Sequence, residues 1–300
     1  MENYGSDKPD LRFSFKISDV TDIASQSDWT PIRSALQGNI GVAKAFVMTG
    51  GGEYIKKSHQ KNWEEIAKKE IGLPGVSLLK VQNKNIVKPM TGKAFSEELS
   101  QLFVNHLEAK EGDVIVMSVG HKSKVLKLLG KLRIAAAEVL ESNNISVRGK
   151  EEFNFLWVTD FPLFEMDETT EKLITCHHPF TAPKPDHIQK LYENPLEVLS
   201  QHYDLVLNGC EIAGGSIRIY EEKLQRDIFD ILNIDPAKFT FLLEALSSGA
   251  PPHGGIALGF DRYISILRNC RSIRDVIGIS KIIDRKVFND GGTRGYFRRK

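Results

Sequence analysis

The 300-residue chain lacks the features that mark disulfide-stapled, zinc-stapled and membrane-spanning proteins. It holds only three cysteines, Cys176, Cys210 and Cys270, and no CxxC pair, which argues against a disulfide framework and a structural zinc site. No apolar run approaches the roughly 18 residues of a membrane-spanning helix. The N-terminus, MENYGSDKPDLRF, is polar and acidic, unlike a secretory signal or an Arg-rich transit peptide. We therefore expect a reducing intracellular compartment and no membrane partner.

Several common nucleotide-binding and catalytic signatures are missing as well. The sequence has no GxxxxGK[ST], GxGxxG, GxSxG or HExxH, which argues against a P-loop, a Rossmann fingerprint, a nucleophile elbow and a zincin. Its 40 Lys and Arg against 39 Asp and Glu leave a net charge of +1, which argues against nucleic-acid binding by bulk charge alone. The charge is uneven, because residues 281–300 hold seven basic and two acidic side chains.

The length and the hydrophobic patterning predict two units of mixed helix and strand. Residues 1–28 read as loop-rich, residues 29–118 as a small α/β module, and residues from 119 onward as a larger α+β unit. Ser96 is expected to cap a helix whose first turn carries two glutamates. Strands are predicted at 42–48, 76–81, 114–117, 154–159, 205–208, 216–220 and 255–260, and further helices at 59–70, 121–141, 194–201, 222–232 and 239–247.

The segment DLVLNGCEIAGGSIR at 204–218 is the most informative one. Asn208-Gly209 between apolar runs is typical of a type I′ hairpin turn, and that turn places Asp204 and Glu211 on one face of the sheet. Two carboxylates on one face repel each other unless a cation lies between them, and Mg²⁺ is the natural candidate. Two solvated charges on an exposed sheet face would give the same pattern.

Three other residues are candidates for binding a carboxylate. His177 and His178 follow Cys176 directly, and adjacent residues of an extended chain point to opposite faces, so this triplet is a poor metal chelator. The pattern favours one imidazole that faces a carboxylate ligand, or else a structural histidine. Arg218 is either an ion-pair partner or a bidentate ligand of a substrate carboxylate.

The last candidate is HGGIALGFDR at 253–262. It predicts a strand of small residues that leads into a helix near Asp261 and Arg262. Glycines at alternate strand positions leave room for a flat ring, and an arginine at the start of a helix suits a phosphate. A close-packed junction between strand and helix is the alternative interpretation.

Together these pieces resemble one family. The pattern GxAxGxDR at 255–262 resembles motif 3 of the class II aminoacyl-tRNA synthetases, and the surrounding blocks resemble the aspartyl-tRNA synthetases of bacterial and mitochondrial type. The resemblance covers about residues 1–278. Its blocks are YGSDKPDLRF at 4–13, LWVTDFPLFE at 156–165, HHPFTAPK at 177–184, NGCEIAGGSIRI at 208–219, APPHGGIALGFDR at 250–262 and SIRDVIG at 272–278.

The resemblance implies an α+β fold, in which an antiparallel class II catalytic core carries an inserted α/β GAD-like domain. It implies that residues 29–118 form the insertion, that 1–28 and 119–279 belong to an incomplete catalytic domain, and that 280–300 form a divergent basic tail. It also implies the roles of individual residues. Glu211, Gly259, Phe260, Asp261 and Arg262 would bind ATP, with Glu211 and Arg262 catalytic; Asp204 and Glu211 would hold Mg²⁺; and His177, His178 and Arg218 would bind the aspartate substrate, with Arg218 on its side-chain carboxylate.

The implied reaction is the ATP-dependent activation of L-aspartate to aspartyl-adenylate, followed by transfer to tRNA(Asp), in a homodimeric enzyme. The implied compartment is the mitochondrial matrix, with a bacterial cytoplasm as the alternative. Motifs 1 and 2 and the anticodon-binding domain should precede YGSDKP, so we expect a C-terminal part that is inactive alone. The competing interpretations are a non-catalytic fragment that binds a full-length synthetase, and a tRNA-independent enzyme such as an ammonia-dependent asparagine synthetase.

Overall fold

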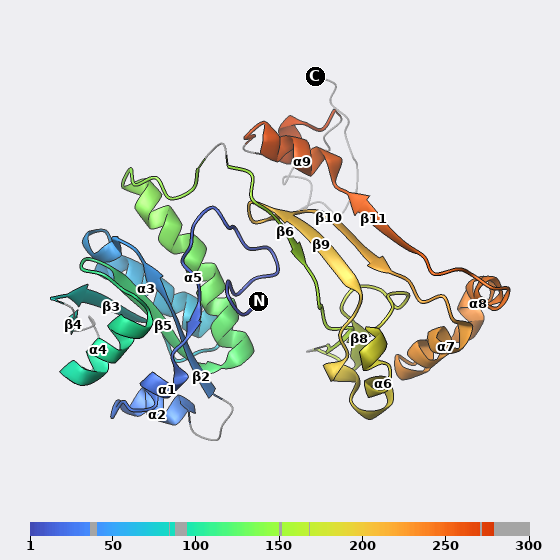
Figure 1. Ribbon diagram of the computed structural model, residues 1–300, viewed down its shortest axis with the longest axis horizontal. Helices are drawn as coiled ribbons and strands as arrows, with labels where there is room; N and C mark the ends of the chain where they lie inside the picture. Colours follow the sequence, from blue (N-terminus) through green and yellow to red (C-terminus); the bar gives the residue numbers. More distant parts are fainter. Residues whose placement is uncertain are drawn as a thin grey trace, which may run out of the picture. The chain divides into compact units, whose positions relative to one another are not determined.

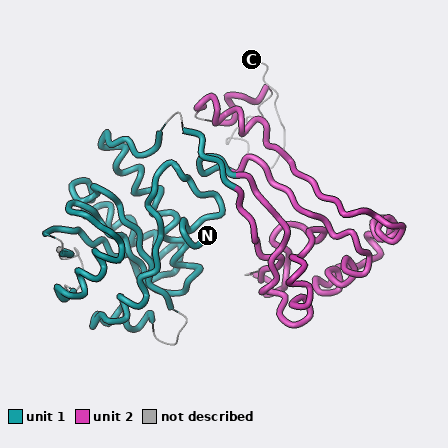
Figure 2. The backbone as a smooth tube through the Cα atoms, in the orientation of Figure 1, with its two compact units in different colours: residues 1–156, 206–210 teal, residues 157–205, 211–300 magenta. Residues whose placement is uncertain are grey.

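The computed structural model divides the chain into two compact units (Figures 1 and 2). One comprises residues 1–156 and 206–210, and the other comprises residues 157–205 and 211–300. The tail predicted at 280–300 lies outside the described residues. The structure describes residues 1–36, 41–83, 85–87, 95–149, 152–167, 169–270 and 272–278.

A five-stranded sheet with the order β1-β2-β5-β3-β4 organises the first unit. Each neighbouring pair in it is antiparallel. The longest pairing joins β2 and β5, from Gly41 opposite His121 to Met48 opposite Val114. The strands are β1 (Ser18–Asp19), β2 (Gly41–Met48), β3 (Ser77–Gln82), β4 (Asn85–Val87) and β5 (Val114–His121).

Both faces of this sheet are covered, because alternate residues of β5 enter different hydrophobic cores. Val114 and Val116 pack in a core with α5, whereas Ile115 and Met117 pack in a core with Phe103 of α4. This explains why β5 reads as a continuous apolar run instead of an alternating one. The helices are α1 (Thr21–Ala24), α2 (Thr30–Leu36), α3 (Lys57–Glu65), α4 (Glu97–His106) and α5 (Lys122–Ser142).

Arg133 of α5 ties the N-terminal segment to the first unit. Its side chain is buried and donates hydrogen bonds to the backbone oxygens of Phe15 (2.6 Å), Phe13 (3.4 Å) and Asp10 (3.4 Å). Its guanidinium carbon also lies 4.8 Å from the ring centroid of Tyr4. Burial lowers the pKa of Arg133 to about 10. A segment with little regular secondary structure is thus held by one side chain that satisfies its carbonyl groups.

The second unit is built on the sheet β11-β10-β9-β6 and on the hairpin β7-β8. The turn between β9 and β10 has positive φ at both Asn208 (51°) and Gly209 (83°), as the predicted type I′ turn requires. The strands are β6 (Phe155–Val158), β7 (Phe164–Met166), β8 (Leu173–Thr175), β9 (His202–Leu207), β10 (Cys210–Ile217) and β11 (Gly254–Leu258).

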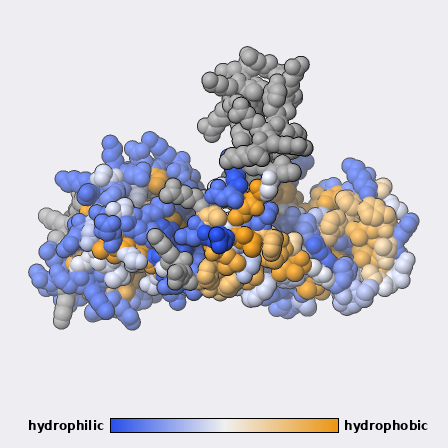
Figure 3. Space-filling model, turned by 90° about the horizontal axis from the view of Figure 1, so that it is seen from above, coloured by the Kyte–Doolittle hydropathy of each residue, from blue (hydrophilic) through white to orange (hydrophobic). Residues whose placement is uncertain are grey.

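Helices α7 and α8 pack against each other in this unit, and α9 follows β11 directly. All five residues of β11 are exposed, among them Ile256 and Leu258. Figure 3 shows hydrophobic residues among hydrophilic ones on one face of the molecule. The helices are α6 (Lys190–Glu193), α7 (Glu222–Ile231), α8 (Thr240–Ser247) and α9 (Phe260–Leu267).

Three predicted elements differ from the structure. In the fully described stretch 194–201 no continuous helix forms, because Asn194 leaves helical geometry and Pro195 starts only a short 3₁₀ turn. The strand predicted at 216–220 is not separate, since β10 runs without interruption from Cys210 to Ile217. The helix predicted at 59–70 is α3 followed by a π-helical stretch, Ile66–Ile71.

The fold class and the membrane prediction can both be compared with the structure. The antiparallel sheets with their packed helices confirm the α+β class. Within the part of the chain that the structure describes, no helix is long and apolar enough to cross a membrane.

Candidate functional site

The β9–β10 hairpin places the two predicted magnesium ligands beside Gly214. A Cβ atom placed on Gly214 would lie 2.7 Å from Oδ1 of Asp204 and 3.5 Å from Oε1 of Glu211. Asp204 is buried and Glu211 is half-buried. The bare backbone of Gly214 therefore leaves the space in which these carboxylates converge. Two converging carboxylates form an oxygen donor set that fits Mg²⁺.

Glu211 also lines a pocket of about 570 Å³. It lies between β10, β11 and the start of α9, and its volume is typical of small-molecule sites. All five residues predicted to bind ATP line it. The lining residues are Glu211, Ile212, Ala213, Ala257, Leu258, Gly259, Phe260, Asp261, Arg262 and Ile273.

Two hydrogen bonds hold the start of α9 against β10. The backbone N–H of Gly259 donates to the oxygen of Ile212 at 2.7 Å. The Arg262 guanidinium donates a short hydrogen bond to the backbone oxygen of Glu211. Arg262 lies in the first turn of an eight-residue helix, so its charge adds to the positive end of the helix dipole. The pocket thus has an exposed cationic side chain at the mouth and an apolar wall at Leu258 and Phe260, which are also exposed.

Arg218 and His178 form a contact pair. Nη1 of Arg218 lies 3.0 Å from Nδ1 of His178 and makes a shorter contact with Nε2. Burial and the neighbouring guanidinium of Arg218 lower the pKa of His178 to about 4. The imidazole of His178 is therefore neutral near pH 7 and can accept a hydrogen bond from Arg218. This arrangement orients the guanidinium and leaves its other N–H groups available for an anionic ligand.

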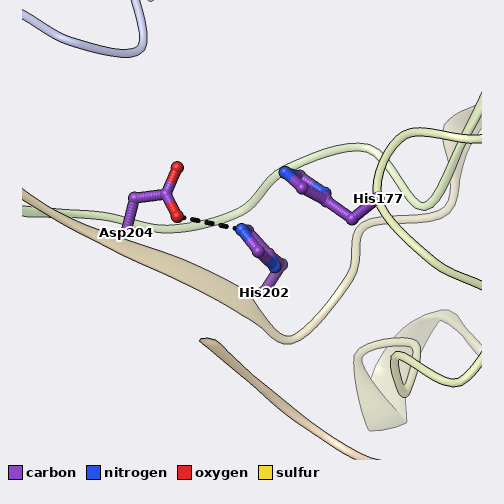
Figure 4. A group of neighbouring side chains, drawn as sticks. All are labelled: His177, His202 and Asp204. Atoms are coloured by element: carbon purple, nitrogen blue, oxygen red, sulfur yellow. Dashed lines mark hydrogen bonds and ion pairs between the residues drawn. The ribbon is translucent and has the colours of Figure 1, made fainter. Parts of the chain in front are cut away.

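His177 points to a different partner from its neighbour. Its ring stacks on that of His202, with centroids 3.4 Å apart, and Nε2 of His202 lies 3.0 Å from Oδ1 of Asp204 (Figure 4). Sequence reasoning missed His202. The signal for it is the spacing of two residues to Asp204 on one strand, which places both side chains on the same face. The nine predicted residues thus fall into the pocket group, the carboxylate pair and two separate histidine groups.

The motif blocks that contain these residues can be compared with known protein families. The family model of class II tRNA synthetases (D, K and N) matches residues 1–282. The chain belongs to this family. Membership of the class II tRNA synthetases confirms the family resemblance that the motif blocks predicted. All nine predicted site residues lie within the matched segment.

Individual relatives of this synthetase chain agree with the family assignment. It is 41% identical over 283 residues to the mitochondrial aspartate–tRNA ligase of Bos taurus, covering 94% of this chain and 43% of that protein. It is 42% identical over 286 residues to an aspartate–tRNA(Asp/Asn) ligase of Dictyoglomus turgidum, covering 94% of this chain and 46% of that protein. The chain therefore spans less than half the length of these curated relatives.

Solved structures are more distant from this synthetase chain. An aspartyl-tRNA synthetase from Entamoeba histolytica is 20% identical, with a TM-score of 0.34 over 49% of this chain and 25% of that one. A likeness of this size supports no argument about the site.

Proposed function

We propose that this chain takes part in aspartate–tRNA ligation, in which ATP activates L-aspartate to aspartyl-adenylate and the aspartyl group passes to tRNA(Asp). One observation carries the proposal: the pocket joins Glu211 to Gly259–Arg262, and Glu211 converges with Asp204 at Gly214. The relatives that are named aspartate–tRNA ligases support it. A homodimer in the mitochondrial matrix, or in a bacterial cytoplasm, belongs to the same proposal.

ATP would lie in the pocket. The glycine-containing strand β11 and the exposed ring of Phe260 offer an apolar surface to the base. Arg262 would bind phosphate oxygens at the start of α9, where the helix dipole adds to its charge. Asp204 and Glu211 would hold Mg²⁺, which neutralises the charge that develops on the phosphates.

L-Aspartate would be recognised by Arg218. Its guanidinium forms two parallel hydrogen bonds with a carboxylate, and the neutral imidazole of His178 keeps it in place. The α-carboxylate of the substrate then attacks the α-phosphate, a mixed anhydride forms and pyrophosphate leaves. The side chains named here position and neutralise these groups, which is the main protein contribution to such transfers.

The division into domains is part of the proposal. We assign the GAD-like insertion predicted at 29–118 to the five-stranded sheet, and we extend it past residue 118 because β5 runs to His121 and α5 packs on the same sheet. Residues 1–28 and the residues from the end of this unit to 279 are assigned to the catalytic domain. The supporting observation is that family-like blocks at 4–13 and 156–165 flank the five-stranded sheet in the sequence.

A binding experiment tests the proposed ATP site directly. A non-hydrolysable ATP analogue is titrated calorimetrically into the chain in the presence of Mg²⁺. We expect Arg262→Ala to weaken binding by about tenfold or more, because a charge-assisted hydrogen bond to phosphate is lost. Arg226→Ala is the matched control, since Arg226 lies on α7 and pairs with Glu222. Equal affinities for the two variants would refute the site.

A further inference from the structure

A group of three potential metal ligands includes Asp204, one of the two carboxylates of the proposed magnesium site. His177, His202 and Asp204 each offer one ligand atom, and these atoms all lie within 4.8 Å of one another (Figure 4). His202 and Asp204 project from the same face of β9, and His177 comes from the loop after β8. All three residues belong to the second compact unit.

His202 carries a polar atom that the fold leaves unsatisfied. Its side chain is nine-tenths buried, and its Nδ1 has no hydrogen-bond partner, while Nε2 contacts Asp204. Native structures contain few such atoms, and an unplaced ion or water is one of the recognised explanations. The ring of Phe161 stands edge-on to both imidazoles at 5.0 Å, so one wall of the cluster is apolar.

The two imidazole rings stack with their centroids 3.4 Å apart, which brings ring nitrogens of both histidines close together. A neutral imidazole has a free lone pair on one nitrogen, which is the form that ligates metals. The adjacent carboxylate of Asp204 supplies the negative charge that a divalent ion needs.

The spacing of the donor atoms suits one small ion. Zinc binds histidine nitrogen and carboxylate oxygen at about 2.0–2.2 Å, so two ligand atoms on a tetrahedral zinc ion lie roughly 3.3 Å apart. The donor atoms of His177, His202 and Asp204 all lie within 4.8 Å of one another, so small side-chain shifts bring them to that spacing. His177 is exposed, so a modest side-chain rotation completes a third ligand and leaves the fourth position to water.

We propose that His177, His202 and Asp204 form a three-ligand site for a divalent transition-metal ion of the Zn²⁺ class. Two imidazole nitrogens select such an ion over Mg²⁺, which prefers an all-oxygen set. This site and the proposed magnesium site have Asp204 in common, and their other ligands differ. An ion bound to the histidines therefore withdraws one carboxylate from the proposed magnesium site.

The test is a direct metal titration, so its result does not depend on the proposed enzymatic function. Zn²⁺ is titrated into the 300-residue chain against a chromophoric chelator, and Co²⁺ serves as a spectroscopic probe of the ligands. We expect one tight ion per chain and a Co²⁺ spectrum without thiolate charge-transfer bands. His177→Gln and His202→Gln should each weaken zinc binding by more than about tenfold.

Two controls separate this site from its alternatives. His253→Gln changes an exposed histidine of the same unit outside the cluster, and it should leave zinc affinity unchanged. Glu211→Gln should affect zinc affinity far less than His177→Gln, which distinguishes the cluster from the carboxylate pair. Because His177 is exposed, its variant keeps the test valid even if His202→Gln fails to fold. Wild-type zinc affinity in His177→Gln, or the absence of a tight ion, overturns the proposal.

Discussion

Gly214 shows how one missing side chain shapes the site. Its Cβ position lies under 3.0 Å from the carboxylate of Asp204, a distance at which one of the two must move. The colliding atom is the end of a side chain and not backbone, so the fold can accommodate a methyl group while the carboxylate cannot keep its place.

We therefore predict that Gly214→Ala weakens Mg²⁺-dependent ligand binding and has little effect on the thermal stability of the fold. Mg²⁺-dependent binding of the ATP analogue should fall by about tenfold or more, because Asp204 turns away from Glu211. The melting temperature should change by only a few degrees, since about 1 kcal/mol corresponds to a shift of that size. Gly75→Ala, at a glycine with open space around its Cβ position, is the control for both calorimetry and circular dichroism. Unchanged analogue binding in Gly214→Ala would contradict the role of the carboxylate pair.

Glu141 supplies a pH-dependent contribution to stability at the end of α5. Arg148 donates to both of its carboxylate oxygens, from Nε at 2.9 and 3.1 Å, and these bonds lower the pKa of Glu141 below its usual 4.5. A depressed carboxylate pKa means that the unfolded state binds more protons as the solution is acidified. The stabilisation is thus complete above pH 4.5 and is lost as the pH falls through the folded-state pKa.

Glu141→Gln should accordingly lower the free energy of unfolding by about 0.5–1 kcal/mol at pH 7. The difference from the parent chain should shrink towards zero as the pH falls through the folded-state pKa of Glu141, which lies below 4.5, because Glu141 is then uncharged like the glutamine. Urea unfolding at a series of pH values measures this. Glu65→Gln, at an exposed carboxylate, should show little effect at any pH. A Glu141→Gln difference that stays constant across the series would rule out the ionic origin.

At the level of helices and strands, the sequence predicted features that depend on local chemistry and missed those that depend on contacts between distant segments. The turn at Asn208-Gly209 and the Ser96 cap of α4 depend on local chemistry, and both are found. The separate strand predicted at 216–220 was wrong, because β10 continues through Gly214 and Gly215 as far as Ile217, and the two glycines leave room for neighbouring atoms. The contact between His177 and His202 joins a loop to a distant strand, and no local pattern contains it.

The N-terminal segment is attached to α5 through Arg133, and a substitution of this residue tests the attachment. Arg133→Met leaves the backbone oxygens of Phe13, Phe15 and Asp10 without their buried donor. We expect a loss of about 2–3 kcal/mol in the free energy of unfolding, because buried acceptors are left unsatisfied. The first residues should also become sensitive to limited proteolysis.

Lys131→Met is the matched control for that experiment. Lys131 lies on the same helix, but its side chain is half-exposed and forms a surface ion pair with Glu70. Its replacement should cost at most about 1 kcal/mol and should leave the N-terminal segment resistant to protease. Equal losses in the two variants would show that Arg133 does not hold the segment.

For the whole molecule, composition predicted less than the motifs did. The net charge of +1 and the ordinary hydrophobic content exclude several classes of protein and identify none. The motif blocks identified the class II tRNA synthetase family. The model of that family matches residues 1–282. The pocket at Glu211 and Arg262 could be found only in the structure, because its walls come from three separate elements: a hairpin, an edge strand and the start of a helix.

The exposure of β11 also has a practical consequence for handling the protein. Among the described strands, β11 lies at the end of its sheet. Its sequence, GGIAL, carries neither the lysine nor the proline that often guards an edge strand. An exposed apolar edge of this kind offers backbone hydrogen bonds to another extended segment. Solubility should therefore be limited by edge-to-edge aggregation, and a charge introduced on this strand is the direct way to improve it.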